Sequence, residues 1–213
     1  MTLLFDFGGV LVRLDRARCV REFRALGFDV TPYLGDYRQD GIFSRLERGE
    51  ISVAEFCAGI REAGGLSAQT DDEAIANAWR SFLTGIPAER LELLLKARRH
   101  YRVCLLSNTN ELHWQQATQD FFRYKGLGAN DFFDHIFLSF ELGCEKPDPR
   151  IYHKVVETLG TPAGDILFFD DSERNCQAAR ECGLRATVAP PDGSWMRLFD
   201  AEGRLPPSAG LEA

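Results

Sequence analysis

The sequence has 213 residues, of which 45% are hydrophobic and 27% are charged. This length and balance predict one globular domain, with or without an insert. The net charge of −7 argues against a general nucleic-acid-binding protein, although a bound cation would still attract an anionic substrate. No stretch approaches the roughly 20 apolar residues of a membrane span. The N-terminal residues also lack the basic run of a signal peptide.

The cysteines and histidines show no metal-ligand spacing. No C-x-x-C pair occurs, and we expect reduced thiols, a cytoplasmic protein, and neither a disulfide framework nor a zinc site. The histidines are predicted to be structural or exposed. We further expect a monomer or homodimer with no nucleic-acid or membrane partner. The residues concerned are Cys19, Cys57, Cys104, Cys144, Cys176, Cys182, His100, His113, His135 and His153.

The chain opens with a predicted buried strand at residues 2–7 that leads into a glycine turn. Asp6 is the first residue past the apolar run, and Gly8 and Gly9 follow it closely. A charged group at the mouth of a buried strand costs several kcal/mol unless a partner neutralises it. Ligands of open α/β sheets lie beyond the carboxyl ends of the strands. Asp6 is therefore the candidate nucleophile.

Residues 15–84 are predicted to be helical throughout, with no strand. An amphipathic helix at 16–26 ends at Gly27, and a further helix is expected to begin at Thr31-Pro32. Ser52 and Glu55 form a capping box, in which the serine caps the helix and the glutamate reaches back. A similar box at 70–73 starts the last of about four helices.

From residue 87 onward, strands and helices alternate. Such alternation predicts βαβ units and a parallel sheet, and hence an α/β fold. The core is expected to comprise residues 1–14 and 85–213, and residues 15–84 are expected to form an inserted all-helical cap. The predicted strands are 102–107, 135–139, 165–169 and 185–188, separated by helices at 87–100, 111–125, 148–160 and 173–182, with a last helix at 194–199.

Polar side chains follow four of these strands, and parallel strands end along one edge of a sheet. Asp170 and Asp171 should therefore lie near Asp6, where their charges would repel unless a hard cation lies between them. Mg²⁺ prefers carboxylate, water and phosphate oxygens, so we expect Asp6, Asp170 and Asp171 to serve as its ligands.

The other strand ends supply groups for an anionic substrate. Ser107 and Asn108 are expected to bind phosphate oxygens, and Lys146 is a compact cation that can neutralise both a phosphoryl group and the nucleophile. A carboxylate nucleophile divides a difficult hydrolysis into two steps through a covalent intermediate. Taken singly, these residues also suit helix caps and turns.

The order of the motifs resembles the haloacid dehalogenase superfamily, of the type with a helical cap after the first strand. The four motifs are Phe5-Asp6-Phe7-Gly8-Gly9-Val10-Leu11, Leu105-Leu106-Ser107-Asn108, Lys146-Pro147-Asp148-Pro149-Arg150-Ile151-Tyr152 and Phe168-Phe169-Asp170-Asp171-Ser172. The resemblance covers essentially the whole chain. It implies a Rossmann-like three-layer α/β/α core, Mg²⁺ dependence and an aspartyl-phosphate intermediate on Asp6.

Within that superfamily, the chain looks most like the bacterial glucose-1-phosphate phosphatase branch. The segments 43–52, 106–110 and 150–152 carry this likeness. Phosphatases of the superfamily usually have a general acid/base aspartate two residues after the nucleophile, and here that position is Gly8. Its backbone carbonyl can still bind Mg²⁺, but it cannot transfer a proton, a contribution of typically about 10²–10⁴-fold.

Two carboxylates, Asp15 and Glu47, are candidate substitutes for this acid, although both also suit a solvated face. Asn175 stands where many relatives have another acid and is expected to orient a metal-bound water. The cap residues expected to select the substrate are Phe43, Arg45, Leu46 and Glu47.

The favoured function is a Mg²⁺-dependent phosphatase that acts on a small phosphate ester, most readily a sugar phosphate. The first alternative is a metal-independent 2-haloacid dehalogenase that also uses Asp6. Asp170 and Asp171 argue against it, because without a cation they would raise the pKa of Asp6 and reduce its nucleophilicity. The second alternative is a catalytically weak regulatory or binding protein that has kept the site.

Overall fold

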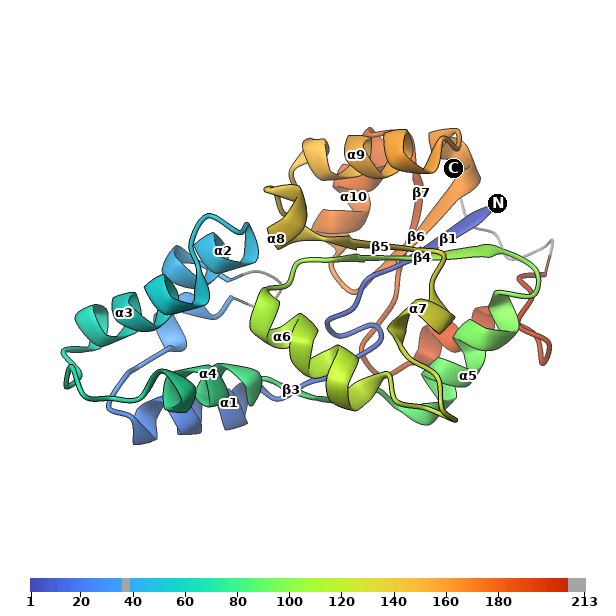
Figure 1. Ribbon diagram of the computed structural model, residues 1–213. Coiled ribbons are helices and arrows are strands. Elements are labelled where there is room, and N and C mark those ends of the chain that lie inside the picture. Colours follow the sequence, from blue (N-terminus) through green and yellow to red (C-terminus); the bar gives the residue numbers. More distant parts are fainter. Residues whose placement is uncertain (36–38, 207–213) are drawn as a thin grey trace.

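The computed structural model describes residues 1–35 and 39–206. Its centre is a five-stranded sheet of order β5-β4-β1-β6-β7 in which every neighbouring pair is parallel, as predicted (Figure 1). The strands are β1 (Thr2–Phe5), β4 (Arg102–Ser107), β5 (His135–Leu138), β6 (Ile166–Asp170) and β7 (Arg185–Val188).

The register of the sheet places the functional strand ends side by side. Phe5, the last residue of the central strand β1, pairs with Leu105 of β4 and Phe169 of β6. The backbone N–H of Asp6 donates to the Phe169 carbonyl at 2.8 Å, so Asp6 continues the register to the level of Asp170. Both carboxylates therefore leave the same edge of the sheet.

Helices cover both faces of the sheet, which confirms the three-layer α/β/α prediction. Leu4 and the alternate residues of its neighbours pack against α9 (Pro149–Leu159) and α10 (Glu173–Glu181). Leu3 and Phe5 point to the other face, where α5 (Ala88–Ala97), α6 (Glu111–Gln116) and α7 (Ala129–Phe132) lie (Figure 1). This alternation is the period-two pattern of a strand that is buried on both sides.

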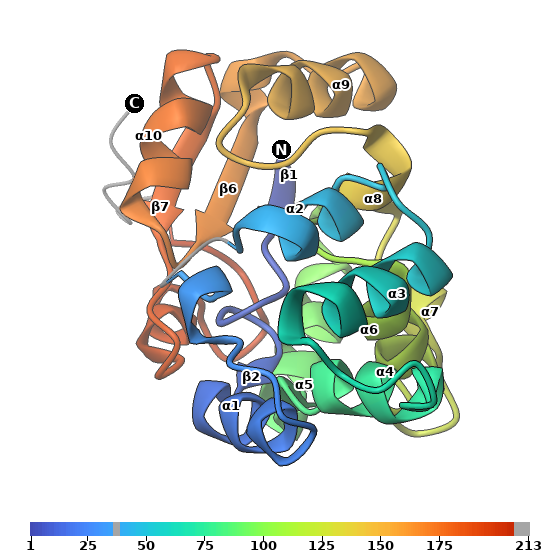
Figure 2. The same ribbon diagram turned by 90° about the vertical axis from the view of Figure 1, so that its left-hand side faces the viewer.

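The hydrophobic core on the α5 face continues into a group of helices beyond the strand ends. These are α1 (Arg16–Ala25), α2 (Gly41–Glu47), α3 (Val53–Gly64) and α4 (Asp72–Arg80), which we call the cap helices (Figures 1 and 2). The predicted capping box of Ser52 and Glu55 is present at the start of α3. The division of the chain into two domains at residues 14/15 and 84/85 stays a prediction.

A short antiparallel ribbon joins the cap helices to the sheet. It consists of β2 (Arg13–Leu14) and β3 (Leu83–Gly85), so the prediction that residues 15–84 hold no strand was wrong. Strands of two and three residues are too short to show an alternating pattern.

Several predicted helix bounds also differ. The helix expected at 111–125 ends at Gln116 and continues as the π-helix η2 (Ala117–Phe121), and the helix expected at Thr31 is the single 3₁₀ turn η1 (Thr31–Tyr33). The turn expected at 141–143 is the end of the short helix α8 (Ser139–Leu142) together with Gly143, which caps it in the left-handed conformation. The remaining 3₁₀ turns are η3 (Ala163–Asp165) and η4 (Ser194–Leu198). No helix in the described ranges has the length and apolar character to cross a bilayer.

Candidate active site

A small cavity of about 70 Å³ lies between the strand ends and the cap helices. Of the seven residues predicted from sequence to form the catalytic, substrate-binding and metal site, five line it, namely Asp6, Gly8, Asn108, Lys146 and Asp171. The other two, Ser107 and Asp170, have no exposed surface and do not line it. The hydroxyl of Ser107 donates to the Asn108 carbonyl at 3.3 Å, and its predicted contact with phosphate stays a prediction.

Lys146 bridges two carboxylates at the strand ends. Its Nζ lies 2.6 Å from Asp6 Oδ1 and 2.7 Å from Asp170 Oδ2, and its side chain is 1% exposed. Burial acts to lower the pKa of Lys146, but Asp170 and Asp6 outweigh it and raise that pKa above its ordinary value. The ammonium is therefore a permanent charge. We call Asp6, Lys146, Asp170 and Asp171 the strand-end cluster.

Asn108 holds the peptide that carries Lys146. Its Oδ1 accepts from the Lys146 backbone N–H at 2.8 Å, and its Nδ2 donates to the Lys146 carbonyl at 2.9 Å. This pair of bonds ties the end of β4 to the loop before α9. Asn108 therefore positions Lys146, a task that sequence reasoning missed because it joins residues far apart in the chain.

Asp170 is held from several directions. Its Oδ1 accepts from the Ser172 backbone N–H at 2.9 Å and from Asn175 Nδ2 at 3.0 Å, while its Oδ2 meets Lys146. Asn175 was predicted to orient a metal-bound water. In the structure its amide orients Asp170, although Asn175 also lines the cavity.

The three carboxylates of the strand-end cluster crowd one another. Burial raises the pKa of Asp6 well above its usual value, Lys146 opposes this, and Asp170 and Asp171 add to it. Burial, followed by the charge of Asp170, raises the pKa of Asp171 to about 6. Each burial shift reflects the cost of an anion in a medium of low polarity.

The cluster fits a divalent cation. One oxygen from each of Asp6, Asp170 and Asp171 lies within 4.8 Å of the others. The cluster sets three carboxyl groups against one ammonium, so a divalent cation would balance the charge of the fully ionised cluster. Carboxylate oxygens are the donors that Mg²⁺ prefers.

The turn after Asp6 approaches Asp171 closely. Gly9 has a φ of +77°, and a Cβ atom there would lie 2.1 Å from Asp171 Oδ2. A residue with a side chain would therefore displace the carboxylate, in addition to its strain at positive φ. From behind, Arg90 donates to the carbonyls of Gly9 and Leu11 at 3.2 Å each. Sequence analysis placed a glycine turn here but gave no sign of Arg90.

The cap helices contribute one carboxyl group to the cavity, that of Glu47, which is 5% exposed. The carboxyl group of Glu47 forms no hydrogen bond within residues 1–35 and 39–206. Asp15, the other candidate acid, caps α1 by accepting from the Arg18 N–H at 2.8 Å and does not line the cavity. Phe43 and Leu46 pack in the hydrophobic core instead.

Hydrogen bonds hold the cap helices against the strand ends. Glu145 accepts from Ser44 Oγ at 2.8 Å and from Arg48 Nη1 at 3.1 Å, and we call these three residues the latch. Ser139 Oγ also donates to the Glu47 carbonyl at 2.5 Å. These contacts fix Glu47 of α2 at the wall of the cavity.

His113 of α6 is a further link to the cap helices. Its Nε2 donates to the Trp79 carbonyl at 2.9 Å, and Asn110 Nδ2 lies 3.3 Å from its Nδ1. The Trp79 carbonyl can only accept, which fixes the proton on Nε2. Burial lowers the pKa of His113 to about 4. The ring is therefore neutral near pH 7, in line with the structural role predicted for it.

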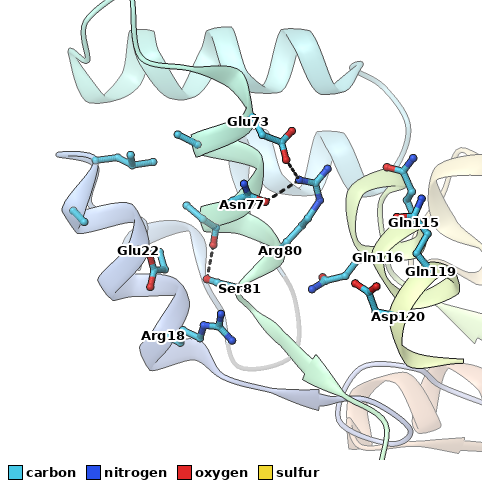
Figure 3. Close-up of a pocket in the computed structure, with 14 residues that line it drawn as sticks. Arg18, Glu22, Glu73, Asn77, Arg80, Ser81, Gln115, Gln116, Gln119 and Asp120 are labelled. Carbon is cyan, nitrogen blue, oxygen red and sulfur yellow. Dashed lines mark hydrogen bonds and ion pairs between the residues drawn. The ribbon is translucent and has the colours of Figure 1, made fainter. Parts of the chain in front are cut away.

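A larger groove of about 720 Å³ lies elsewhere, between α1 and α4 on one side and α6 and η2 on the other (Figure 3). Its walls are polar, and some of their groups pair with one another. Arg80, for example, donates to Glu73 at 2.7 Å and to Asn77 at 3.0 Å. None of the strand-end cluster lines this groove.

Comparison with known proteins agrees with this geometry. The model of a haloacid dehalogenase-like hydrolase family matches residues 1–183. A D-ribitol-5-phosphate phosphatase of Bacteroides thetaiotaomicron is 34% identical over 193 residues, which span 90% of this chain and 92% of the relative.

Solved structures give the same picture. An enzyme of this family from Bacteroides thetaiotaomicron, in complex with magnesium and inorganic phosphate, has a TM-score of 0.87 at 41% identity, over 93% of this chain and 98% of the other. A family member from Porphyromonas gingivalis has a TM-score of 0.83 at 29% identity, over 92% and 94% of the two chains.

Proposed function

The chain belongs to the haloacid dehalogenase-like hydrolases, and we propose that it is a Mg²⁺-dependent phosphatase acting on a small phosphorylated polyol or sugar. The observation that carries this proposal is the strand-end cluster, in which Lys146 lies between Asp6 and Asp170 at the edge of the cavity. The similarity to a D-ribitol-5-phosphate phosphatase supports the substrate class. The finer likeness to glucose-1-phosphate phosphatases stays a prediction.

Asp6 is the proposed nucleophile. A bond forms between its carboxylate oxygen and phosphorus while the bond from phosphorus to the ester oxygen breaks. A water then attacks phosphorus, releases phosphate and restores Asp6. Lys146 stabilises the negative charge on both partners, and the Phe7 backbone N–H, which donates to Asp6 Oδ1 at 2.7 Å, fixes the carboxylate.

The residues proposed to hold Mg²⁺ are Asp6, Asp171 and the backbone carbonyl of Gly8, with Asp170 behind them. When bound, the ion supplies positive charge that lets an anionic nucleophile approach an anionic phosphate. The excess of carboxyl groups over ammonium groups in the strand-end cluster supports this set. It also argues against a metal-free dehalogenase.

Glu47 is the proposed proton donor for the departing alkoxide, in place of the aspartate that Gly8 lacks. It is the one acid lining the described cavity that does not belong to the strand-end cluster. Its place on α2 brings it to the cavity only when the cap helices are closed. Protonation of the leaving group would then be confined to the closed state, which excludes bulk water.

The remaining expectations enter as parts of the same proposal. The helices at 15–84 act as a movable cap over a core of residues 1–14 and 85–213, of which 207–213 lie outside the described residues. A cytoplasmic location, a monomer or homodimer, and the absence of a nucleic-acid partner stay predictions.

The experiment measures hydrolysis of ribitol 5-phosphate and p-nitrophenyl phosphate with Mg²⁺, with EDTA, and by the Asp6→Asn variant. We expect EDTA and the variant each to lower kcat/KM by about 10³-fold or more, because each removes a group on which chemistry depends. Activity that survives both changes contradicts the proposal. Chloride release from 2-chloropropionate without metal would instead favour the dehalogenase alternative.

A further inference from the structure

The cavity contains a second unusual group from the cap side, the amide of Gln39. Its side chain lines the cavity, and the residue is only 8% exposed. Its Oε1 is buried and has no hydrogen-bond partner in the described ranges of the chain. A buried acceptor without a partner carries the full cost of its lost hydration. A group retained at such a cost beside a candidate active site points to a partner supplied by a ligand.

The backbone that carries Gln39 is fixed. Gln39 forms an antiparallel bridge with Leu34, and the N–H of the next residue, Asp40, donates to the Tyr33 carbonyl at 2.9 Å. Helix α2 then begins at Gly41. The amide therefore projects from a braced segment, so a partner would meet it without first having to order the backbone.

The chemistry of the Gln39 oxygen limits the kind of partner it can take. The junction between core and cap lines the cavity with the apolar side chains of Leu14, Phe82 and Leu83. A carbonyl oxygen only accepts, so the partner must donate. A neutral amide oxygen suits a neutral donor such as a hydroxyl, and one hydroxyl satisfies it.

We propose that Gln39 Oε1 accepts a hydrogen bond from a hydroxyl of the substrate's leaving group and thereby selects polyhydroxylated phosphate esters over esters of plain alcohols. This inference rests on the proposed phosphatase function and assigns its specificity to one cap-side atom. A site built to bind a hydroxyl discriminates strongly against an analogue without it, because the buried acceptor is then left unpaired.

The test compares ribitol 5-phosphate with n-pentyl phosphate, since both release a primary alkoxide and only the first carries hydroxyls. In Gln39→Leu, the ratio of the two kcat/KM values is expected to fall by about 5- to 20-fold through loss of one buried hydrogen bond. Activity on p-nitrophenyl phosphate should stay near that of the wild type. The matched control is Gln69→Leu, which makes the same change at an exposed cap position and should leave the ratio unchanged.

The outcomes separate this inference from the proposed function. A folded variant with an unchanged ratio, or with equal losses on both esters, overturns the role of Gln39 while phosphatase activity persists. A preference of the wild type for 5-aminopentyl phosphate overturns the choice of a hydroxyl. If the wild type hydrolyses none of these esters, both ideas fail together. If Gln39→Leu does not fold, Gln39→Met removes the acceptor with a side chain of similar length and decides the question.

Discussion

The two sides of the cavity differ in how their polar groups are paired. On the sheet side, Lys146 contacts both Asp6 and Asp170, and the second oxygen of Asp170 accepts two further hydrogen bonds. On the cap side, Gln39 Oε1 is buried and has no hydrogen-bond partner in the described parts of the chain, and Glu47 lines the cavity. Gln39 is 8% exposed and Asp6 is 7% exposed, so burial alone does not explain the contrast between these two groups.

The contrast separates two tasks of a phosphatase. The phosphoryl group is the same in every substrate, so the groups that meet it can be paired and fixed in advance. The leaving group varies, and an unpaired acceptor on the cap side can accept a hydrogen bond from a donor that the leaving group offers. Three experiments, in order of decreasing expected effect, test this division. They ask whether the paired groups act on the phosphoryl group and whether the unpaired groups act on the leaving group.

Lys146→Met should have the largest effect, since it removes the ion pairs of Lys146 with Asp6 and Asp170. We expect kcat/KM to fall by about 10³-fold and the free energy of unfolding by about 3–5 kcal/mol, because two buried carboxylates lose their cation. Urea unfolding in metal-free buffer and hydrolysis of p-nitrophenyl phosphate measure both. Lys96→Met, at an exposed position on α5, is the control. If Lys146→Met is as stable as the wild type, the ion pairs of Lys146 do not contribute to the free energy of unfolding.

Glu47→Gln should reduce activity less and only for some substrates. We expect kcat/KM for ribitol 5-phosphate to fall by about 10²-fold, within the usual range of general acid catalysis. For p-nitrophenyl phosphate the loss should stay within a few-fold, because p-nitrophenolate leaves without a proton. Glu62→Gln, on the exposed surface of α3, is the control. Equal losses on both esters would rule out proton donation to the leaving group.

The same variant should also change stability. Burial, then the charge of Glu145, raises the pKa of Glu47 to about 8 in the folded protein, above its unfolded value. Its contribution to stability is therefore present below about pH 4.5 and lost as the pH rises through 8. Glu47→Gln should be more stable than the wild type at pH 8.5 by a few kcal/mol and nearly equal at pH 4.5. The opposite order would mean that the carboxylate is paired.

His113 should give the smallest effect, because its ring links α6 to the cap helices and is neutral near pH 7. Its folded pKa of about 4 lies below the ordinary value of 6.5, so its contribution to stability is present above pH 6.5 and lost as the pH falls through 4. Relative to His113→Gln, the wild type should lose about 2–3 kcal/mol of unfolding free energy between pH 7.5 and 4.5. Parallel pH profiles of the two proteins would contradict this assignment.

The paired side was largely predictable from sequence. Each residue of the strand-end cluster follows a buried strand or the loop after one, and parallel strands end at one edge. Asp6, Lys146 and Asp171 were identified in this way, and the structure brings them together. The buried position of Ser107 was not foreseen, because it depends on which way the chain turns after β4.

The unpaired side could not be predicted beyond a general region. The contribution of Glu47 depends on how α2 is set against the strand ends, which Ser139 and Glu145 fix from about a hundred residues away in the chain. Gln39 gave no signal at all, since a polar residue before a helix usually suits a cap or solvent. Lack of pairing is a property of the complete environment, which no local pattern records.

The adjacency of Glu145 and Lys146 has an evolutionary consequence. Glu145 contacts Ser44 and Arg48 of the cap, and the next residue, Lys146, pairs with Asp6, the proposed nucleophile. Mutations that move this peptide to admit a larger substrate also move the ammonium beside Asp6. Substrate range and turnover are therefore expected to change together when mutations alter this peptide. New specificities are therefore easier to reach at positions such as Gln39, which can change while the latch stays intact.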